Sequence, residues 1–150
     1  MKALSIRQPW AHNIIHNGKD IENRTWRTHY RGPILIHAGS RMDDGFNRYP
    51  SLQMGGIIGW CDIVDCVTES ESEWFNGPYG FVLANVHPLP FIPCKGALSF
   101  FVPDIRDQVC LMHLHDKLSE GQACLVLSLG RIQFRKLFDE YCGYGAWDEK

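Results

Sequence analysis

Residues 4–26 read LSIRQPWAHNIIHNGKDIENRTW, and the hydrophobic period changes twice within them. The opening residues 3–6 alternate as a short strand does, and this strand ends before Pro9, which is favoured at the first position of a helix. Apolar residues then recur at helical spacing through 10–17, and Gly18 suits the left-handed turn that ends a helix. This segment predicts a strand followed by one short amphipathic helix.

After the glycine, residues 21–26 alternate between two faces, as the side chains of a strand do. One face carries Glu22, Arg24 and Trp26. The other face carries Ile21, Asn23 and Thr25. Because both faces are largely polar, this strand is poor material for a core, and we expect it to line a cleft or to form an exposed edge.

Short strand signals separated by glycine and proline turns continue along the chain. They cover residues 33–38, 55–67, 80–84 and 98–102. The segment 88–93 contains prolines at both ends and in the middle, so we expect it to cross the surface or run along an edge rather than form a central strand. With one helix inserted early, the pattern predicts an α+β fold, a small β-barrel with short peripheral helices.

The hydrophobic pattern weakens from residue 103 onward. A strand around 123–127 and a helix around 134–141 are the elements that we expect there. We therefore divide the chain into a barrel domain over residues 1–102 and a C-terminal extension over residues 103–150, which packs on the barrel or completes it.

Composition narrows the class of protein. The chain of 150 residues suffices for one domain with a true core, and its formal net charge of -2 provides no global cationic field for binding polyanions. No apolar run approaches the ~20 residues that span a bilayer, and no signal-peptide core is present, so we expect a cytoplasmic protein with no membrane partner. The six cysteines form no C-x-x-C pair, so we expect buried or half-buried thiols, no metal site and no cofactor.

Six short stretches carry a family resemblance. They are 4–11 (LSIRQPWA), 18–27 (GKDIENRTWR), 36–38 (IHA), 59–64, 78–80 and 93–97. A Lys-x-x-Glu-x-Arg core alone is a weak pattern, but its place after a helix preceded by Arg-Gln-Pro-Trp makes the combination specific. Together they resemble the ASCH domain, the activating-signal-cointegrator homology branch of the PUA-like superfamily, over residues 1–102.

The resemblance implies a PUA-like β-barrel with a cleft that faces RNA or a modified nucleoside. Two activities are associated with such domains: RNA binding, sometimes with cleavage, and amidohydrolysis of an acylated cytidine by a lysine, a threonine and a glutamate. Lys19 matches that lysine. Glu22 stands in the place of the threonine, so a hydroxyl nucleophile does not carry over to this chain.

Lys19 and Glu22 are our candidate catalytic pair. A lysine beside a carboxylate in a partly closed cleft shifts the protonation of its partner, and one of the two can relay a proton to water. The alternative is a salt bridge that joins the polar strand to the end of the helix.

The candidate ligand-binding residues come from the polar strand and from other segments. Arg7, Arg24 and Lys95 are candidates for phosphate, with ion pairs or a solvated turn as the alternative. Trp26 is a candidate for stacking on a base, whereas Trp10 has the phase of the helix core. The remaining candidates are Gln8, Asn23, Asn85 and His37, the last of which also suits a satisfied core position.

Three classes of function stay open. The first is a small hydrolase that acts on an N-acylated pyrimidine nucleoside through Lys19 and Glu22, with a ribonuclease as its variant. The second is a non-catalytic module whose cleft binds short single-stranded RNA, and the third is an adaptor that uses the C-terminal extension. The balanced charge favours a small ligand over a long polyanion, and the sequence predicts no oligomeric state.

Overall fold

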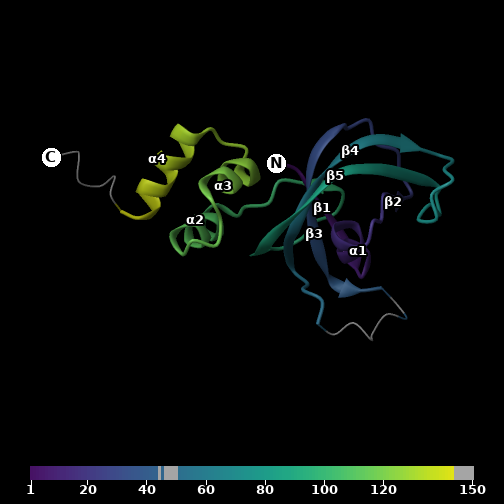
Figure 1. The fold of residues 1–150 in the computed structure, drawn as a ribbon, viewed down its shortest axis with the longest axis horizontal. Coiled ribbons are helices and arrows are strands. Elements are labelled where there is room, and N and C mark those ends of the chain that lie inside the picture. Colours follow the sequence, from purple (N-terminus) through teal and green to yellow (C-terminus); the bar gives the residue numbers. More distant parts are fainter. Residues whose placement is uncertain (44, 46–50, 144–150) are drawn as a thin grey trace. The chain divides into compact units, whose positions relative to one another are not determined.

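A computed structural model describes residues 1–43, 45 and 51–143. Within them the chain forms six strands and four α-helices in the order β1, α1, β2, β3, β4, β5, β6, α2, α3, α4 (Figure 1). The chain divides into two compact units, and all of the strands and α1 lie in Lys2–Pro103. The α+β class predicted from the sequence is confirmed.

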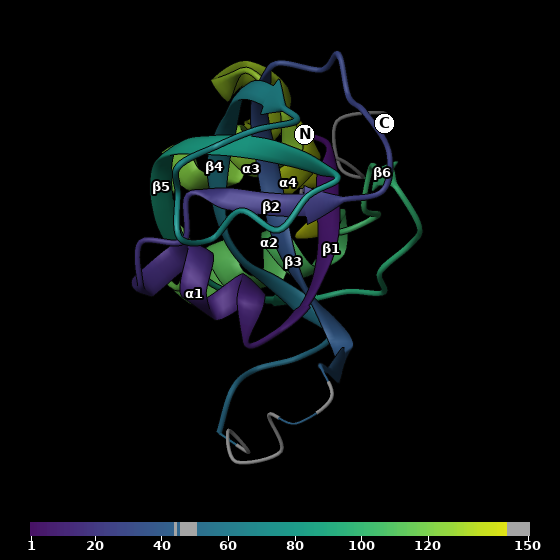
Figure 2. The ribbon, with the colours of Figure 1, turned by 90° about the vertical axis from the view of Figure 1, so that its right-hand side faces the viewer.

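One six-stranded sheet, ordered β2-β5-β4-β3-β1-β6, forms the first unit. Its strands are β1 (Ala3–Gln8), β2 (Ile21–Arg24), β3 (Gly32–Met42), β4 (Gly56–Val67), β5 (Tyr79–Pro93) and β6 (Phe100–Phe101). Neighbouring strands are antiparallel except β1 and β3, which run parallel with Ser5 opposite His37. The sheet curls into a half-barrel whose edges are β2 and β6 (Figure 2).

A buried apolar cluster joins the strands of the half-barrel to α1 (Trp10–His16). Its members are Leu4, Ile6, Ala11, Ile14, Ile34, Ile36, Ala38, Ile58, Cys61, Ile63, Phe81 and Leu83. In β1 and β3 every second residue enters the cluster, because successive side chains of a strand point to opposite faces.

The six cysteines are free, and each of them is buried or half-buried, as predicted.

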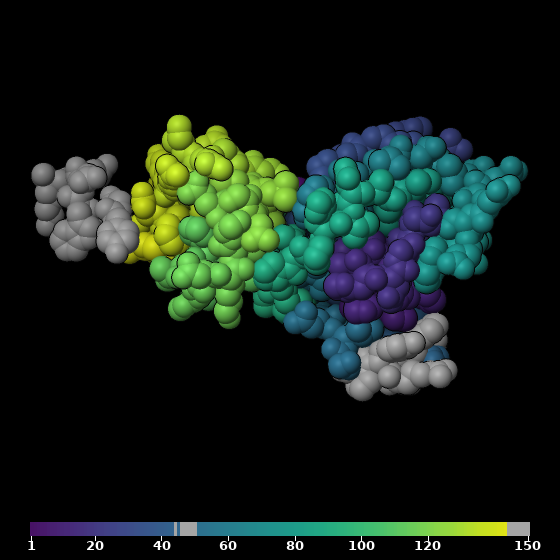
Figure 3. Space-filling model, viewed as in Figure 1, coloured from purple at the N-terminus to yellow at the C-terminus, as the bar shows by residue number. Residues whose placement is uncertain are grey.

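The helix α1 packs on the sheet through one apolar face. Ala11 and Ile14 are buried, and Gly59 of β4 makes the close approach possible, because a Cβ there would lie 2.5 Å from Cδ1 of Ile15. Gly18 follows the end of the helix with a φ of 70°, the left-handed conformation predicted for it. The N-terminal segment that includes α1 is visible in purple at the surface of its unit (Figure 3).

The proline-containing segment 88–93 differs from the prediction, because β5 runs through it without interruption. Ile92 pairs with Ile57 of β4, whereas β2 pairs only with residues 79–82 of β5. The second half of β5 thus has an open edge, where the missing N–H of proline is tolerated. The segment follows an edge as predicted, but it does so as a strand of the sheet.

The second unit contains α2 (Arg106–Leu114), α3 (Glu120–Leu127) and α4 (Arg131–Tyr141). The helix expected around residues 134–141 is confirmed as part of α4, and α2 was not predicted. Phe134 of α4 is buried, and its ring centroid lies 5.2 Å from that of His113 of α2. Residues 144–150 of the extension lie outside the described residues, and its packing on the barrel stays a prediction.

The strand predicted at residues 123–127 is wrong, because this segment belongs to the helix α3. The helix begins with a capping box: the hydroxyl of Ser119 accepts a hydrogen bond from the N–H of Gln122, whose side chain accepts one from the N–H of Ser119. A short apolar run has no distinctive period, so the cap that precedes it determines the element.

Among the described helices, none is long and apolar enough to cross a membrane.

A chain that ends at residue 103 is expected to fold cooperatively, because the whole sheet and α1 lie within Lys2–Pro103. Urea unfolding followed by near-ultraviolet circular dichroism and by tryptophan fluorescence checks this, and the two transitions should coincide. An insoluble fragment, or one without a cooperative transition, would show that the C-terminal unit completes the barrel.

Candidate functional site

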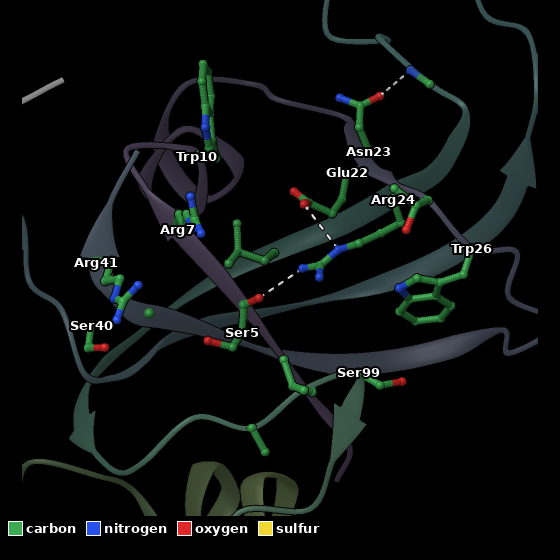
Figure 4. Close-up of a pocket in the computed structure, with 16 residues that line it drawn as sticks. Ser5, Arg7, Trp10, Glu22, Asn23, Arg24, Trp26, Ser40, Arg41 and Ser99 are labelled. Carbon is green, nitrogen blue, oxygen red and sulfur yellow. Dashed lines mark hydrogen bonds and ion pairs between the residues drawn. The ribbon is translucent and has the colours of Figure 1, made fainter. Parts of the chain in front are cut away.

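A cleft of about 560 Å³ lies where the half-barrel is open, between β2 and β1. We call it the seam cleft. It is lined by residues 5–7 of β1, residues 22–26 in and after β2, residues 39–41 of β3, Trp10, Gly77 and residues 97–99. In the view of Figure 4, Arg7 and Arg41 lie at one end of the cleft and Trp26 lies at the other.

A second cavity of about 430 Å³ adjoins the seam cleft, and we call it the lysine cavity. It is lined by Trp10, Lys19, Glu22, Asn23, Asp43, Glu73, Trp74 and Asn76. The two cavities share Trp10, Glu22 and Asn23. The prediction that the polar strand lines a cleft or forms an edge is confirmed on both points, because β2 is an edge strand and its residues line both cavities.

Lys19 places a buried ammonium group in the lysine cavity. Only 4% of its side chain is exposed, and Nζ donates a hydrogen bond to the carbonyl oxygen of Ile21. The same nitrogen lies 5.8 Å from the ring centroid of Trp10, 5.7 Å from that of Trp74 and 4.0 Å from Oε2 of Glu22. Burial lowers the pKa of Lys19, and the nearby Glu22 opposes this change.

Glu22 is a buried carboxylate with one unsatisfied oxygen. Its Oε1 lies 3.5 Å from Nε of Arg24, and 10% of its side chain is exposed. Its Oε2 has no hydrogen-bond partner among the described residues. Burial raises the pKa of Glu22, while Arg24 and Lys19 act to lower it. Because a buried acceptor without a donor is costly, this oxygen is suited to receive an N–H or O–H of a ligand.

Arg24 joins the two sides of the seam. Its Nη2 donates a hydrogen bond to the carbonyl oxygen of Ser5 at 2.9 Å, so a side chain of β2 reaches the backbone of β1 (Figure 4). The same guanidinium is paired with Glu22. Arg24 thus lines the cleft and also fixes the position of β2 relative to β1 through these two interactions.

Two further cleft residues are held by Asp43. Arg7 is exposed, and its Nη1 lies 3.6 Å from Oδ1 of Asp43. Trp10 donates from Nε1 to Oδ2 of the same carboxylate at 2.8 Å. Trp10 is half-buried and lines both cavities, so it packs at the margin of the core and not within it as its helical phase indicated.

Asn23 holds the segment that carries Trp74. Its Nδ2 donates to the carbonyl oxygen of Trp74 at 2.9 Å, and its Oδ1 accepts hydrogen bonds from the N–H groups of Asn76 and Gly77 at 2.8 and 3.0 Å. This residue thus shapes the lysine cavity by fixing one of its walls. Its side-chain amide is already used by the protein.

Trp26 lies at the seam, where its ring is half-buried. The ring meets Phe81 of β5 edge-on at 5.1 Å and Phe100 of β6 at 5.4 Å between centroids. The sequence predicted that Trp26 shares a strand face with Glu22 and Arg24. This is wrong, because β2 ends at Arg24. Trp26 nevertheless lines the same cleft as Glu22 and Arg24.

Gln8 and His37 do not line either cavity. The side-chain oxygen of Gln8 accepts a hydrogen bond from the N–H of His12, so Gln8 holds the start of α1. His37 is 1% exposed, and its two ring nitrogens lie 2.9 Å from the carbonyl oxygen of Cys94 and from the hydroxyl of Ser5. Since a carbonyl only accepts, Nε2 donates to Cys94, and in the neutral ring Nδ1 then accepts from the hydroxyl of Ser5. This histidine is a satisfied core residue, the alternative considered for it.

Asn85 and Lys95 are also outside the lining of the two cavities. Asn85 donates from Nδ2 to Oδ2 of Asp62 at 3.0 Å, and Lys95 is exposed. The sequence pattern missed other lining residues, of which Arg41, Glu73 and Trp74 carry the chemistry most relevant to a ligand. No local period indicated them, because they reach the cleft from segments remote in sequence from β2.

The fold and the two cavities define a class of protein: a small α+β half-barrel with a polar cleft at its open side. The family model of the ASCH domain matches residues 4–92, and the chain belongs to this family, which is PUA-like. The predicted family resemblance is confirmed.

Two curated relatives are both named "Activating signal cointegrator 1". The human (Homo sapiens) protein is 27% identical over 122 residues, which covers 62% of this chain and 20% of that protein. The mouse (Mus musculus) protein is 30% identical over 88 residues, which covers 45% of this chain and 15% of that protein. The aligned part is thus a fifth or less of the length of these relatives.

The substitution Glu22→Gln is expected to stabilise the protein at neutral pH. Burial raises the pKa of Glu22 in the folded state, so the folded state prefers the neutral carboxyl group. The stability that this group contributes is present below its unfolded pKa and is lost as pH rises through the folded pKa. Glutamine mimics the neutral group at every pH.

Melting temperatures measured between about pH 4 and pH 7.5 check this. The variant should exceed the parent at the upper end, and the difference should shrink as pH falls. Glu71→Gln removes an exposed carboxylate outside both cavities and serves as the control. A variant that melts lower than the parent at pH 7.5 would show that the ion pairs of Glu22 outweigh its burial.

Proposed function

We propose that this ASCH-domain chain binds a nucleobase in the lysine cavity and hydrolyses an N-acyl group from a modified pyrimidine nucleoside, using Lys19 and Glu22. The observation that carries the proposal is the unsatisfied Oε2 of Glu22, a buried acceptor beside a buried ammonium group. Buried titratable groups with displaced pKa values, set in a cavity, are typical of functional sites.

The dimensions and walls of the lysine cavity support a base as the ligand. Its volume of about 430 Å³ falls within the range of about 300 to 1,000 Å³ common for small-molecule sites. Trp10 and Trp74 supply aromatic surface for an unstacked ring, and the carboxylates supply acceptors for its N–H groups. Glu73 is a second carboxylate at the same cavity, beside the pair predicted from the sequence.

In the proposed reaction, Glu22 acts as general base. It removes a proton from a water molecule, whose oxygen attacks the acyl carbon, and the ammonium group of Lys19 stabilises the negative charge on the carbonyl oxygen. The protonated Glu22 then delivers its proton to the exocyclic nitrogen as the C–N bond breaks. The products are a carboxylic acid and the free amine of the base, so one water molecule is consumed in each turnover.

The protonation states fit these roles. A carboxylate whose pKa is raised is a stronger base toward water, and Glu22 meets this condition through its burial. Burial lowers the pKa of Lys19, while Glu22 and the two tryptophan rings favour its charged form. No hydroxyl nucleophile is needed at the position that Glu22 occupies.

A second candidate function is RNA binding without catalysis. The ASCH domain is associated with RNA binding, and the arginines of the seam cleft favour a ligand that carries phosphate. In this alternative Lys19 and Glu22 bind the edge of a base and do no chemistry. Hydrolysis of an acylated nucleoside by the purified protein distinguishes the two candidates.

Lys19→Ala and Glu22→Gln should each lower turnover of an N-acylated cytidine by about 10² or more, the usual effect of removing a positioned acid or base. The double variant should be little worse than the poorer single variant, because the two groups act as a unit. Initial rates followed by chromatography of the released cytidine check this. Lys117→Ala and Glu71→Gln, which change exposed residues outside both cavities, are the controls and should match the parent.

The pH dependence of kcat/KM should form a bell whose limbs lie between the ordinary pKa values of the two groups. Activity should rise with pH as Glu22 loses its proton, with a midpoint above the ordinary pKa of 4.5. It should fall again as Lys19 loses its proton, with a midpoint below the ordinary pKa of 10.5. Burial is the cause of both displacements. A profile that is flat across this window, in a protein that stays folded throughout, would contradict the assigned roles.

A further inference from the structure

We propose that the two cavities bind consecutive nucleotides of one single-stranded RNA, with the reacting base in the lysine cavity and its neighbour in the seam cleft. This inference rests on the proposed function, which places a base in the lysine cavity. It extends that function by assigning the class of substrate: a base within a strand and not a free nucleoside.

The first observation is the shared wall. Trp10, Glu22 and Asn23 line both cavities, so a ligand that fills one of them is in reach of the other without crossing the protein. The seam cleft, at about 560 Å³, is the larger of the two. A free nucleoside held in the lysine cavity would leave this larger space without a ligand group.

The second observation is the difference in charge between the cavities. The lysine cavity sets one cation, Lys19, against three carboxylates, those of Glu22, Asp43 and Glu73. The seam cleft carries three arginines and one carboxylate, that of Glu22. An acidic cavity suits the N–H groups of a base, whereas the arginine-rich cleft suits the phosphate of a backbone.

The arginines of the seam cleft are not equally available to a phosphate. Arg24 is used by Glu22 and by the carbonyl oxygen of Ser5. Arg7 makes one long ion pair, and Arg41 has no ion-pair partner among the described residues. Arg7 and Arg41 lie at the same end of the cleft (Figure 4). Arg7 at this end and Trp10, one of the three residues shared with the lysine cavity, contact the same carboxylate, that of Asp43.

The third observation is apolar surface in the same cleft. Leu98 is 95% exposed, although it lines the cleft, and Trp26 presents part of its ring there. The residue that follows, Ser99, has a φ of 58°, a conformation that is uncommon for a residue other than glycine. Exposed apolar and aromatic side chains beside arginines suit an unstacked base, which single strands offer and duplexes do not.

Fluorescence anisotropy with a labelled single-stranded RNA of about 6 nucleotides, in the full chain, tests this assignment at several salt concentrations. The RNA should bind about tenfold or more tighter than the nucleoside of the same base, through one further stacked base and two phosphate contacts. The logarithm of affinity should fall with the logarithm of salt with a slope of about 1.4, since each contact on a single strand contributes about 0.7.

Arg41→Gln should weaken RNA binding and lower this slope to about 0.7, while leaving affinity for the nucleoside unchanged. The matched control is Arg31→Gln, which changes an arginine that pairs with Asp65 outside both cavities and should behave as the parent. Because both substitutions concern exposed or cleft-lining arginines of the same unit, a difference between them reports on the cleft.

The inference is overturned if the nucleoside binds as tightly as the strand, if Arg41→Gln behaves as Arg31→Gln does, or if duplex RNA binds as well as single-stranded RNA. Equal affinity for DNA of the same sequence overturns the choice of RNA. These outcomes do not depend on turnover. Hydrolysis of a free acylated nucleoside at the rate of the strand would leave the proposed function standing and remove this inference. RNA binding as expected without any hydrolysis would remove the proposed reaction and leave only the assignment of two consecutive nucleotides to the two cavities.

Discussion

Side chains, and not backbone hydrogen bonds, join β2 to β1, and the cleft depends on this arrangement. The two strands are not neighbours in the sheet, so the half-barrel is open between them. Arg24 reaches from β2 to the carbonyl oxygen of Ser5, and Trp26 packs edge-on against Phe100 on the opposite edge. Because long side chains leave space that a ladder of backbone hydrogen bonds would fill, the seam is both closed enough to hold polar groups and open enough to admit a ligand.

The polar groups at this seam are only partly compensated. Glu22 is paired with Arg24 at 3.5 Å and with Lys19 at 4.0 Å, both longer than a good hydrogen bond, and its Oε2 has no hydrogen-bond donor among the described residues. Buried charges in such geometry recover little of the cost of leaving water. We expect this cluster to lower the stability of the folded protein, and the ligand that we propose would supply the missing donor.

Much of the first unit could be predicted from local patterns. Short stretches of sequence predict the two-residue period of β3, the helical spacing of Ala11 and Ile14, and the left-handed Gly18. In the strand and the helix this works because burial of one face makes apolar residues recur at a regular spacing. Local patterns failed where the deciding interaction lay outside the apolar run. In α3 it was the cap at Ser119, and in β5 it was the absence of a second neighbour beside the prolines.

The sequence by itself determined which chemical groups the polar strand and the turn before it carry. Lys19, Glu22 and Arg24 are close along the chain, so any fold that makes residues 21–24 an edge strand brings them together. Only the tertiary structure decided what surrounds them. Asn23 holds the segment that brings Trp74 to the lysine cavity, and the end of β3 brings Arg41 to the seam cleft. Contacts between segments this far apart in sequence depend on how the sheet curls, so the hydrophobic periodicity within one segment cannot predict them.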